Sequence, residues 1–368
     1  MVQRTICDGR VWLETDFTGA LEWLEVHSST ESERAGFGTG WSGIIRVSIS
    51  ANVYSSLVSQ ACTSTQLSTR RLYEEETYLR IPKESRVAFV APPGLAETLP
   101  HAIVGSYDSG WEIVVPDRSC RSKRQVLRSV RSILRGYQLQ KGAVAVHSGF
   151  AGGVLFVGRS GAGKTSAAVR FARLGGLLVS TDRTLVRVPA SGTGPIGIGC
   201  PEVVRLGAGF VSELGNAVAE LRGSARGRFT DSVMAESVTR FGSKEKREFT
   251  FEDLRSLLAI RSVDSSSIAA VVFPEPTDRY GYLEEVEDGV CSGIIEEQVL
   301  HPDPKHGHPL APEMLGPREA RAALAEMIEG VPKYRLGWAI DSDEERRAVF
   351  TELEHNVRAF ESDGSSNG

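Results

Sequence analysis

One segment of the chain has the residue types and spacing of a phosphate-binding loop (P-loop). Gly158-Arg-Ser-Gly-Ala-Gly-Lys-Thr165 matches the pattern Gly-x4-Gly-Lys-Ser/Thr in full. The glycines let backbone N–H groups converge on a phosphate without Cβ clashes, and a following helix directs its N-terminal amides at the same anion. Lys164 then bridges the β- and γ-phosphates of ATP, while the hydroxyl of Thr165 coordinates Mg²⁺. The predicted nucleotide site comprises Gly158, Ser160, Gly161, Ala162, Gly163, Lys164, Thr165 and Ser166.

A carboxylate follows the next apolar segment along the chain. The apolar run Gly153–Val157 predicts a buried strand before the loop, and Leu177–Ser180 predicts a second one that leads directly to Asp182. In an open α/β sheet a ligand lies beyond the carboxyl ends of the strands, so Asp182 is expected at the same edge as the loop. There it can hold Mg²⁺ or accept the proton of an attacking hydroxyl. The structural alternative is a helix-capping or turn aspartate.

Other carboxylates and histidines have weaker sequence support. Glu275 follows the later apolar run Ala269–Phe273 and is an alternative metal ligand, although the prolines on either side of it favour a structural turn. A histidine-rich tract resembles a metal site, but its prolines indicate an irregular loop, and we expect no metal there. That tract contains His301, His306 and His308.

Three basic residues are candidates for contacting the acceptor of the reaction. Arg183 directly follows the predicted catalytic carboxylate. Lys246 and Arg247 belong to a basic segment that can clamp the transferring phosphoryl group or an anionic acceptor. A solvated, charged loop is the alternative interpretation of that segment.

An ordered set of features extends around the loop. His147 closes a predicted strand at 142–147, the P-loop and a short helix follow, and a strand then ends at Asp182. With Val331-Pro-Lys-Tyr-Arg-Leu336, this order resembles the HPr kinase/phosphorylase-like kinases, a P-loop group whose core is related to phosphoenolpyruvate carboxykinase. The resemblance covers about 140 to 340 discontinuously. It implies an α/β core of that type, transfer of the γ-phosphoryl group to a hydroxyl, and catalytic roles for His147, Lys164 and Asp182.

Two departures from the family pattern bear on function. Thr181 stands where the family has the first of two aspartates, so either Asp182 serves as both metal ligand and base or another carboxylate supplies one role. The later family signature is matched only loosely, at Glu220-Leu-Arg-Gly223. The resemblance therefore supports phosphoryl transfer more than HPr as the acceptor. We expect a serine- or threonine-type hydroxyl of a peptide, a protein or an amino-acid-like metabolite.

Two other functional classes compete with a kinase. A nucleotide-binding regulatory protein would keep the P-loop without transferring phosphate, and Thr181 in place of an aspartate is the best support for it. A GTPase or ATP-driven motor is disfavoured because neither Asn/Thr-Lys-x-Asp nor Leu-Ser-Gly-Gly occurs in the sequence. Reverse phosphorolysis stays open.

Apolar periodicity divides the chain into two parts. Residues 1–120 predict a β-rich N-terminal domain, which can recognise the acceptor, with strands at 87–91 and 111–115. A further strand is predicted from an alternation of apolar and polar residues over Ile45, Val47, Ile49, Ala51 and Val53. Residues 121–360 predict the P-loop domain, with helices at 165–174, 318–329 and 343–360, before a disordered tail at 361–368.

The helix predicted at 121–137 bridges the two parts and has a strongly basic face. That face can bind a phosphate-bearing partner, although a solvated helix face is the commoner explanation. Its residues are Arg121, Lys123, Arg124, Arg128, Arg131 and Arg135.

Composition restricts the partners and the compartment. The 368 residues are 41% apolar and 24% charged, which is typical of a globular protein. A net charge of −5 gives no general attraction to nucleic acid or to a membrane surface. Five scattered cysteines, without an apolar secretory segment or membrane span, favour free thiols in the cytoplasm. The oligomeric state stays open, with a homo-oligomer among the alternatives.

Overall fold

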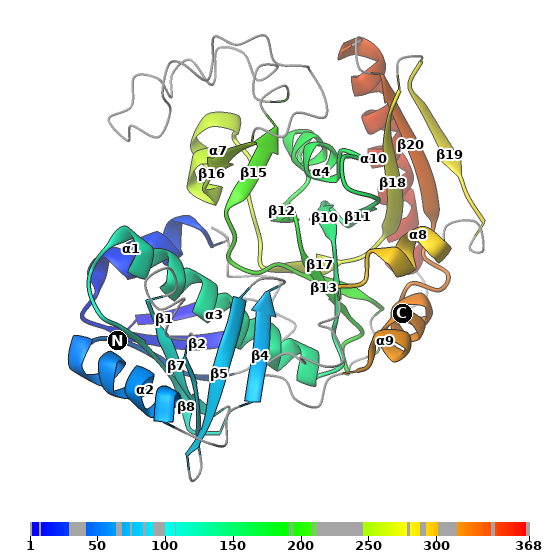
Figure 1. Ribbon diagram of the computed structural model, residues 1–368. Helices are drawn as coiled ribbons and strands as arrows, with labels where there is room; N and C mark the ends of the chain where they lie inside the picture. The colour runs from blue at the N-terminus through cyan, green and yellow to red at the C-terminus, as the bar shows by residue number, and fades with distance from the viewer. Residues whose placement is uncertain are drawn as a thin grey trace.

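The computed structural model describes the chain in segments that include all of 108–190. The described residues are 2–6, 9–28, 42–63, 68–73, 76–83, 86–90, 100–106, 108–190, 192, 194–207, 210, 246–277, 280–287, 292–300, 315–339 and 343–365. Glu220 and the predicted histidine tract lie outside these residues. Within them the protein is a mixed α/β structure with several sheets (Figure 1). No helix in this part of the chain is long and apolar enough to cross a membrane.

The first half of the chain forms an eight-stranded mixed sheet in the order β1-β2-β3-β8-β7-β6-β5-β4. Strands β6 and β8 match the strands predicted at 87–91 and 111–115. The bounds are β1 Val2–Ile6, β2 Gly9–Thr15, β3 Ser42–Ile49, β4 Ser68–Tyr73, β5 Glu76–Lys83, β6 Arg86–Val90, β7 Ala102–Ser106 and β8 Gly110–Val115.

The strand predicted to reach Val53 ends earlier. Strand β3 stops at Ile49, and the chain turns into α2, Ala51–Thr63. Buried Tyr54, Leu57 and Ala61 recur at helical spacing in α2, and Ser50 accepts a hydrogen bond from the amide of Val53 at its start. The alternation of apolar and polar residues therefore does not continue as a strand beyond Ile49, because the following residues form a helix whose apolar face packs on the sheet.

Helices α1, Thr18–Val26, and α3, Cys120–Gln140, share a hydrophobic core with this sheet. Helix α3 matches the helix predicted at 121–137 and extends it at both ends. The same core includes residues well beyond the predicted boundary at 120: Ala143, Ala145, Leu185, Ile196 and Ile198. The two halves are therefore joined by a common core.

The P-loop half is built on a six-stranded sheet in the order β12-β10-β11-β18-β20-β19. The strands are β10 Ser148–Ala151, β11 Val154–Val157, β12 Leu178–Ser180, β18 Ala270–Thr277, β19 Tyr282–Glu285 and β20 Lys333–Ala339. Strands β11, β18 and β20 are parallel, but β10 and β19 run antiparallel to their neighbours. The sheet is thus mixed, with both parallel and antiparallel pairs of strands. Gly152 and Gly153, both with positive φ, close a tight turn that folds β10 back along β11.

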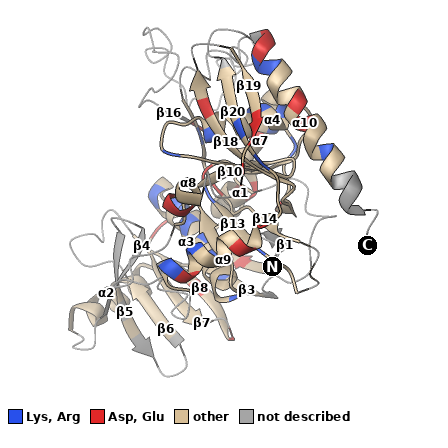
Figure 2. Cartoon of the chain, turned by 90° about the vertical axis from the view of Figure 1, so that its right-hand side faces the viewer, with Lys and Arg blue, Asp and Glu red and all other residues tan. Residues whose placement is uncertain are grey.

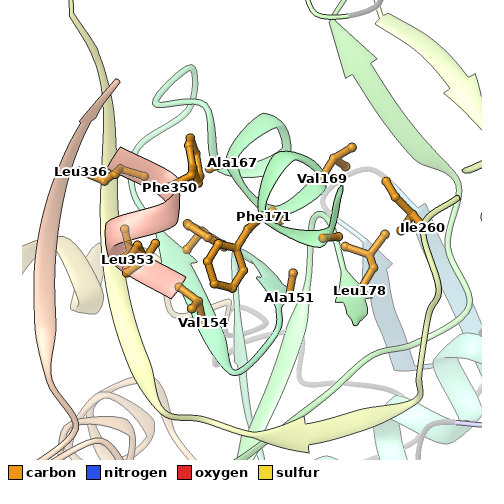
Figure 3. Packing of buried hydrophobic residues seen from close by; sticks show 14 of the residues in the cluster. Ala151, Val154, Ala167, Val169, Phe171, Leu178, Ile260, Leu336, Phe350 and Leu353 are labelled. Atoms are coloured by element: carbon orange, nitrogen blue, oxygen red, sulfur yellow. The ribbon is translucent and has the colours of Figure 1, made fainter. Parts of the chain in front are cut away.

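Helices and apolar side chains cover both faces of this sheet. On one face, α4, Lys164–Arg173, and α10, Asp343–Ser365, pack over Val154 and Phe156 (Figure 3). On the other face, Leu155 and Val157 join a core with α9, Pro317–Met327. Both β11 and its neighbours are therefore buried on both sides, as their continuous apolar runs predict. Helix α10 continues to Ser365, five residues into the segment predicted as a tail.

Smaller elements connect the two halves. A four-stranded sheet has the order β17-β14-β13-β9, and a separate pair is formed by β15 and β16. Their bounds are β9 Val144–Val146, β13 Thr184–Arg187, β14 Ile196–Ile198, β15 Val204–Gly207, β16 Lys246–Phe249 and β17 Ser265–Ser267, with α7 Phe251–Leu258 and α8 Ser292–Glu297. His147 lies between β9 and β10, where the chain passes from one sheet into the other.

Candidate active site

The backbone of the P-loop has the conformation that its glycines predict. Gly161 and Gly163 have φ values of +85° and +89°, in the left-handed region that favours glycine. A Cβ atom on Gly163 would lie 2.4 Å from the indole of Trp338 on β20. Gly163 is also the N-cap residue of α4, and no side chain caps that end of the helix. The amides of the first turn of α4 are therefore available to an anion.

Lys164 and Thr165 already make contacts within the P-loop site. The Nζ atom of Lys164 donates hydrogen bonds to the carbonyl oxygens of Gly158 (2.6 Å) and Arg159 (3.1 Å). The hydroxyl of Thr165 donates to the carbonyl oxygen of Thr181 at 2.9 Å. Thr165 is thus connected to the segment that follows β12, where the sequence places Asp182.

Strand direction brings Asp182 to the edge of the sheet that carries the P-loop. Strands β11 and β12 each pair antiparallel with β10, so both point the same way and both end beside the site. Oδ1 of Asp182 lies 3.4 Å from Nε2 of His147, and Oδ2 lies 3.4 Å from Nε of Arg183. The structure therefore unites His147, Asp182 and Arg183.

The electrostatic environment of Asp182 favours its ionised form. The hydrogen bond with His147 is the main cause that lowers the pKa of Asp182 from 3.8 to about 2; burial opposes it, and the charge of Arg183 reinforces it. The Asp182 side chain remains 56% exposed. At neutral pH Asp182 is a carboxylate that solvent, a cation or a substrate can reach.

A buried network of hydroxyl groups lies next to the pair. Oγ1 of Thr184 bonds to Oγ of Ser148 (2.8 Å) and to Oγ of Ser180 (2.6 Å), and all three residues are fully buried. The amide of Ser148 also donates to the carbonyl oxygen of Asp182 at 3.2 Å. These bonds join the start of β10, the end of β12 and the start of β13, which fixes the backbone around His147 and Asp182.

A second carboxyl group, Glu202, adjoins the site and was not among the residues predicted from the sequence. One of its oxygens accepts hydrogen bonds from the amide (2.5 Å) and the hydroxyl (2.7 Å) of Thr181. Burial is the main cause that raises the pKa of Glu202 from 4.5 to about 7, and the charge of Asp182 adds to it. The one sequence signal is that Glu202 is the only acidic residue between Asp182 and Glu213.

Basic residues lie along α3 (Figure 2), and two of them interact with acidic groups of the P-loop half. The charge of Arg131 lowers the pKa of both Asp182 and Glu202. Arg124, further towards the start of α3, lies 3.8 Å from Glu248 of β16. Arg124 and its partner Glu248 are both exposed, so this pair is one that a solvated helix face can form, whereas the charge of Arg131 acts on the carboxyl groups of the site.

The alternative metal carboxylate, the basic segment and the other P-loop residues have different surroundings. The side chain of Glu275, the alternative metal carboxylate, accepts a hydrogen bond from Tyr282, whose ring crosses over Gly337. Lys246 and Arg247 begin β16, and their side chains lie outside the described residues. Ser160 is exposed, whereas Ala162 and Ser166 are half-buried. Arg159, at the second position of the P-loop, forms a bidentate ion pair with Glu297 of α8. Its Nε lies 3.1 Å from one carboxylate oxygen and its Nη2 lies 3.2 Å from the other.

The donor atoms at the site suit Mg²⁺. Thr165 and Asp182 offer hydroxyl and carboxylate oxygens, which this hard cation prefers. In the part of the chain that the structure describes, no cluster of three or more His, Cys, Asp or Glu side chains could hold a metal by itself. A few protein ligands, completed by water and nucleotide phosphates, are the usual arrangement for Mg²⁺. The residues present therefore fit that cation.

Comparison with known proteins adds no family assignment. No model of a known protein family matches the chain, and no curated protein matches it. The residues that bear on function are those of the P-loop, the Asp182–His147 pair and Glu202.

Proposed function

We propose that the chain is a kinase that binds ATP and Mg²⁺ at Gly158–Thr165 and transfers the γ-phosphoryl group to a hydroxyl acceptor. One observation carries the proposal: the hydroxyl of Thr165 is hydrogen-bonded to the residue that precedes Asp182, so the P-loop and the Asp182–His147 pair form one site. The order of these elements is also similar to that of the HPr kinase/phosphorylase-like family. A P-loop core of that type and a cytoplasmic location are part of the proposal.

The nucleotide would be held by charge and by backbone amides. The ammonium of Lys164 turns from the carbonyl oxygens of the loop to the β- and γ-phosphates, while the amides at the start of α4 bind the same groups. Thr165 and Asp182 would hold Mg²⁺, which neutralises charge on the phosphates when bound. Because its pKa is about 2, Asp182 suits this role well.

Proton acceptance from the attacking hydroxyl would involve the Asp182–His147 pair. A carboxylate with a pKa of about 2 is a weak base by itself, because catalytic bases work best with pKa values near the operating pH. The neighbouring imidazole of His147, 3.4 Å away, can share the proton and is held in place by the carboxylate. Arg183, and Lys246 and Arg247, stay candidates for contacting the acceptor, a peptide, a protein or a small amino-acid-like molecule.

The test is transfer of label from γ-labelled ATP to a panel of proteins, peptides and free amino acids. Lys164→Ala should abolish transfer while leaving the protein folded, because it removes the cation between the β- and γ-phosphates. Lys141→Ala is the matched control, since Lys141 is an exposed lysine at the end of α3 that contacts Tyr137. Undiminished transfer by a folded Lys164→Ala variant would refute the proposal.

A nucleotide-binding regulatory protein is the second candidate function. The specific observation in its favour is that the site has Thr181 where the family has an aspartate, and that Glu202 is occupied with hydrogen bonds to that threonine. Such a protein would bind ATP with Mg²⁺ but transfer no label to any member of the panel. Equilibrium binding of fluorescent ATP, measured beside the transfer assay, separates the two functions.

A further inference from the structure

A chain of hydrogen bonds connects the N-terminal half of the protein to the P-loop. The amide of Glu202 donates to the carbonyl oxygen of His27 at 3.1 Å, just after the end of α1. The carboxyl of Glu202 in turn accepts from the amide and hydroxyl of Thr181, and the carbonyl oxygen of Thr181 accepts from the hydroxyl of Thr165. Three steps thus join α1 to the residue expected to bind Mg²⁺.

We propose that the carboxyl-terminal turn of α1 is a positioning element for the P-loop site, acting through Glu202 and Thr181. The inference rests on the proposed function in that the positioned residue, Thr165, is assigned there to the nucleotide and its Mg²⁺. It also changes the role expected of residues 1–120, from acceptor recognition alone to support of the catalytic site.

Hydrogen bonds and ring packing of its own side chains hold the carboxyl-terminal turn of α1. His27 is 1% exposed, and its Nδ1 donates to the carbonyl oxygen of Trp23 at 2.7 Å while the two rings lie against each other, 4.5 Å between centroids. Oγ of Ser28 donates to the carbonyl oxygen of Leu24, also at 2.7 Å. These bonds satisfy carbonyl groups at the end of α1, which has no basic residue in its last turn. The carbonyl oxygen of His27, which accepts from Glu202, therefore belongs to a turn with several hydrogen bonds of its own.

The segment that contains Glu202 packs against the N-terminal half of the protein. Glu202 and Thr181 are 4% and 1% exposed, so their hydrogen bonds are sheltered from water. Cys200 and Val203, on either side of Glu202, pack against the core that contains Leu24 of α1 and the apolar face of α3. A buried polar group that loses its partner costs free energy, so this segment is expected to follow α1 when α1 moves.

The experiment compares His27→Phe with Val114→Ala in the full chain. Phenylalanine keeps an aromatic ring beside Trp23 but cannot donate a hydrogen bond to the Trp23 carbonyl oxygen, so we expect it to loosen the turn. Val114→Ala removes a buried side chain beneath α2, in a separate core cluster of the same sheet, and controls for general loss of stability. We expect His27→Phe to increase amide hydrogen exchange at Glu202 about tenfold or more, and Val114→Ala to leave it near the wild-type rate.

Transfer kinetics test the consequence for the site. A misplacement of about 1 Å can cost roughly 100-fold in rate, so we expect kcat to fall about 10- to 100-fold in His27→Phe and less than twofold in Val114→Ala. Thr181→Val, which removes one hydroxyl from the chain, should also lower kcat, and Thr181→Ser, which retains it, should restore kcat. This pair keeps the proposal testable if His27→Phe does not fold.

The outcomes separate the two proposals. Equal effects of His27→Phe and Val114→Ala on Glu202 exchange, or wild-type kcat in Thr181→Val, would overturn the positioning role. If the wild-type chain transfers no phosphate, the proposed kinase fails, but the exchange of the Glu202 amide still decides whether α1 holds this segment.

Discussion

The buried carboxyl of Glu202 predicts an unusual pH dependence of stability. Its pKa is raised from 4.5 to about 7, first by burial and then by the charge of Asp182. The folded state therefore binds this proton more tightly than the unfolded chain does. The resulting stability is fully present below about pH 4.5 and is lost as the pH rises through about 7. At 1.36 kcal/mol per pKa unit, the loss is on the order of 3 kcal/mol.

Glu202→Gln tests this value because glutamine cannot titrate. Urea unfolding across about pH 4.5 to 8 should show a decline of a few kcal/mol in the wild type and a nearly flat curve in the variant. Asp182 does not interfere, because its lowered pKa makes stability fall only as the pH drops from 3.8 towards 2. Glu284→Gln, at an exposed position on β19, is the control and should retain the wild-type slope. The same decline in Glu202→Gln as in the wild type would refute the reasoning.

Three further predictions concern the site and the fold. Asp182→Asn should still bind ATP but lose roughly 10²–10⁴ in kcat, the range expected when a positioned proton acceptor is removed. Kinetics of transfer from labelled ATP measure this loss. A kcat within threefold of wild type would reject the role of Asp182 and make Glu275 or Glu220 the candidate carboxylate. Gly163→Ala should destabilise the protein by about 2 kcal/mol or more, because the φ angle of Gly163 is +89° and Trp338 occupies the space that a Cβ atom would need. It should also weaken ATP binding. Calorimetry measures the stability, and a titration with fluorescent ATP measures the binding. The fragment 121–368 should fail to fold alone, since α3 would lose the sheet it packs on; cooperative unfolding of the fragment, followed by circular dichroism, would contradict the shared core.

The backbone conformation of the segment 158–165 was predictable because the sequence signal for it is local. A phosphate-binding turn needs glycines, a lysine and a hydroxyl at fixed spacing, and Gly161 and Gly163 have the positive φ values that such a turn requires. The position of Asp182 was also predictable, because strand direction follows from the order of buried strands and the helix between them.

Residues whose contacts depend on distant parts of the chain were not predictable in this way. Glu202 is an isolated carboxylate in an apolar stretch, and its importance arises only where Thr181 and His27 meet it. The alternation through Ala51 and Val53 imitates a strand, although α2 packs there with helical spacing. The antiparallel β10 was missed because continuous apolar runs indicate burial on both faces but carry no information on strand direction.

The contact between Gly163 and Trp338 has a consequence for the order in which the protein matures. The indole that lies against the P-loop belongs to Trp338 of β20. In the sequence, most of the second half of the chain lies between the P-loop and β20. During synthesis the loop sequence leaves the ribosome long before β20 can pair with β18. The P-loop therefore packs against Trp338 only after β20 has been added to the sheet. Competence to bind nucleotide should therefore appear late and abruptly in biosynthesis, not gradually as the chain lengthens.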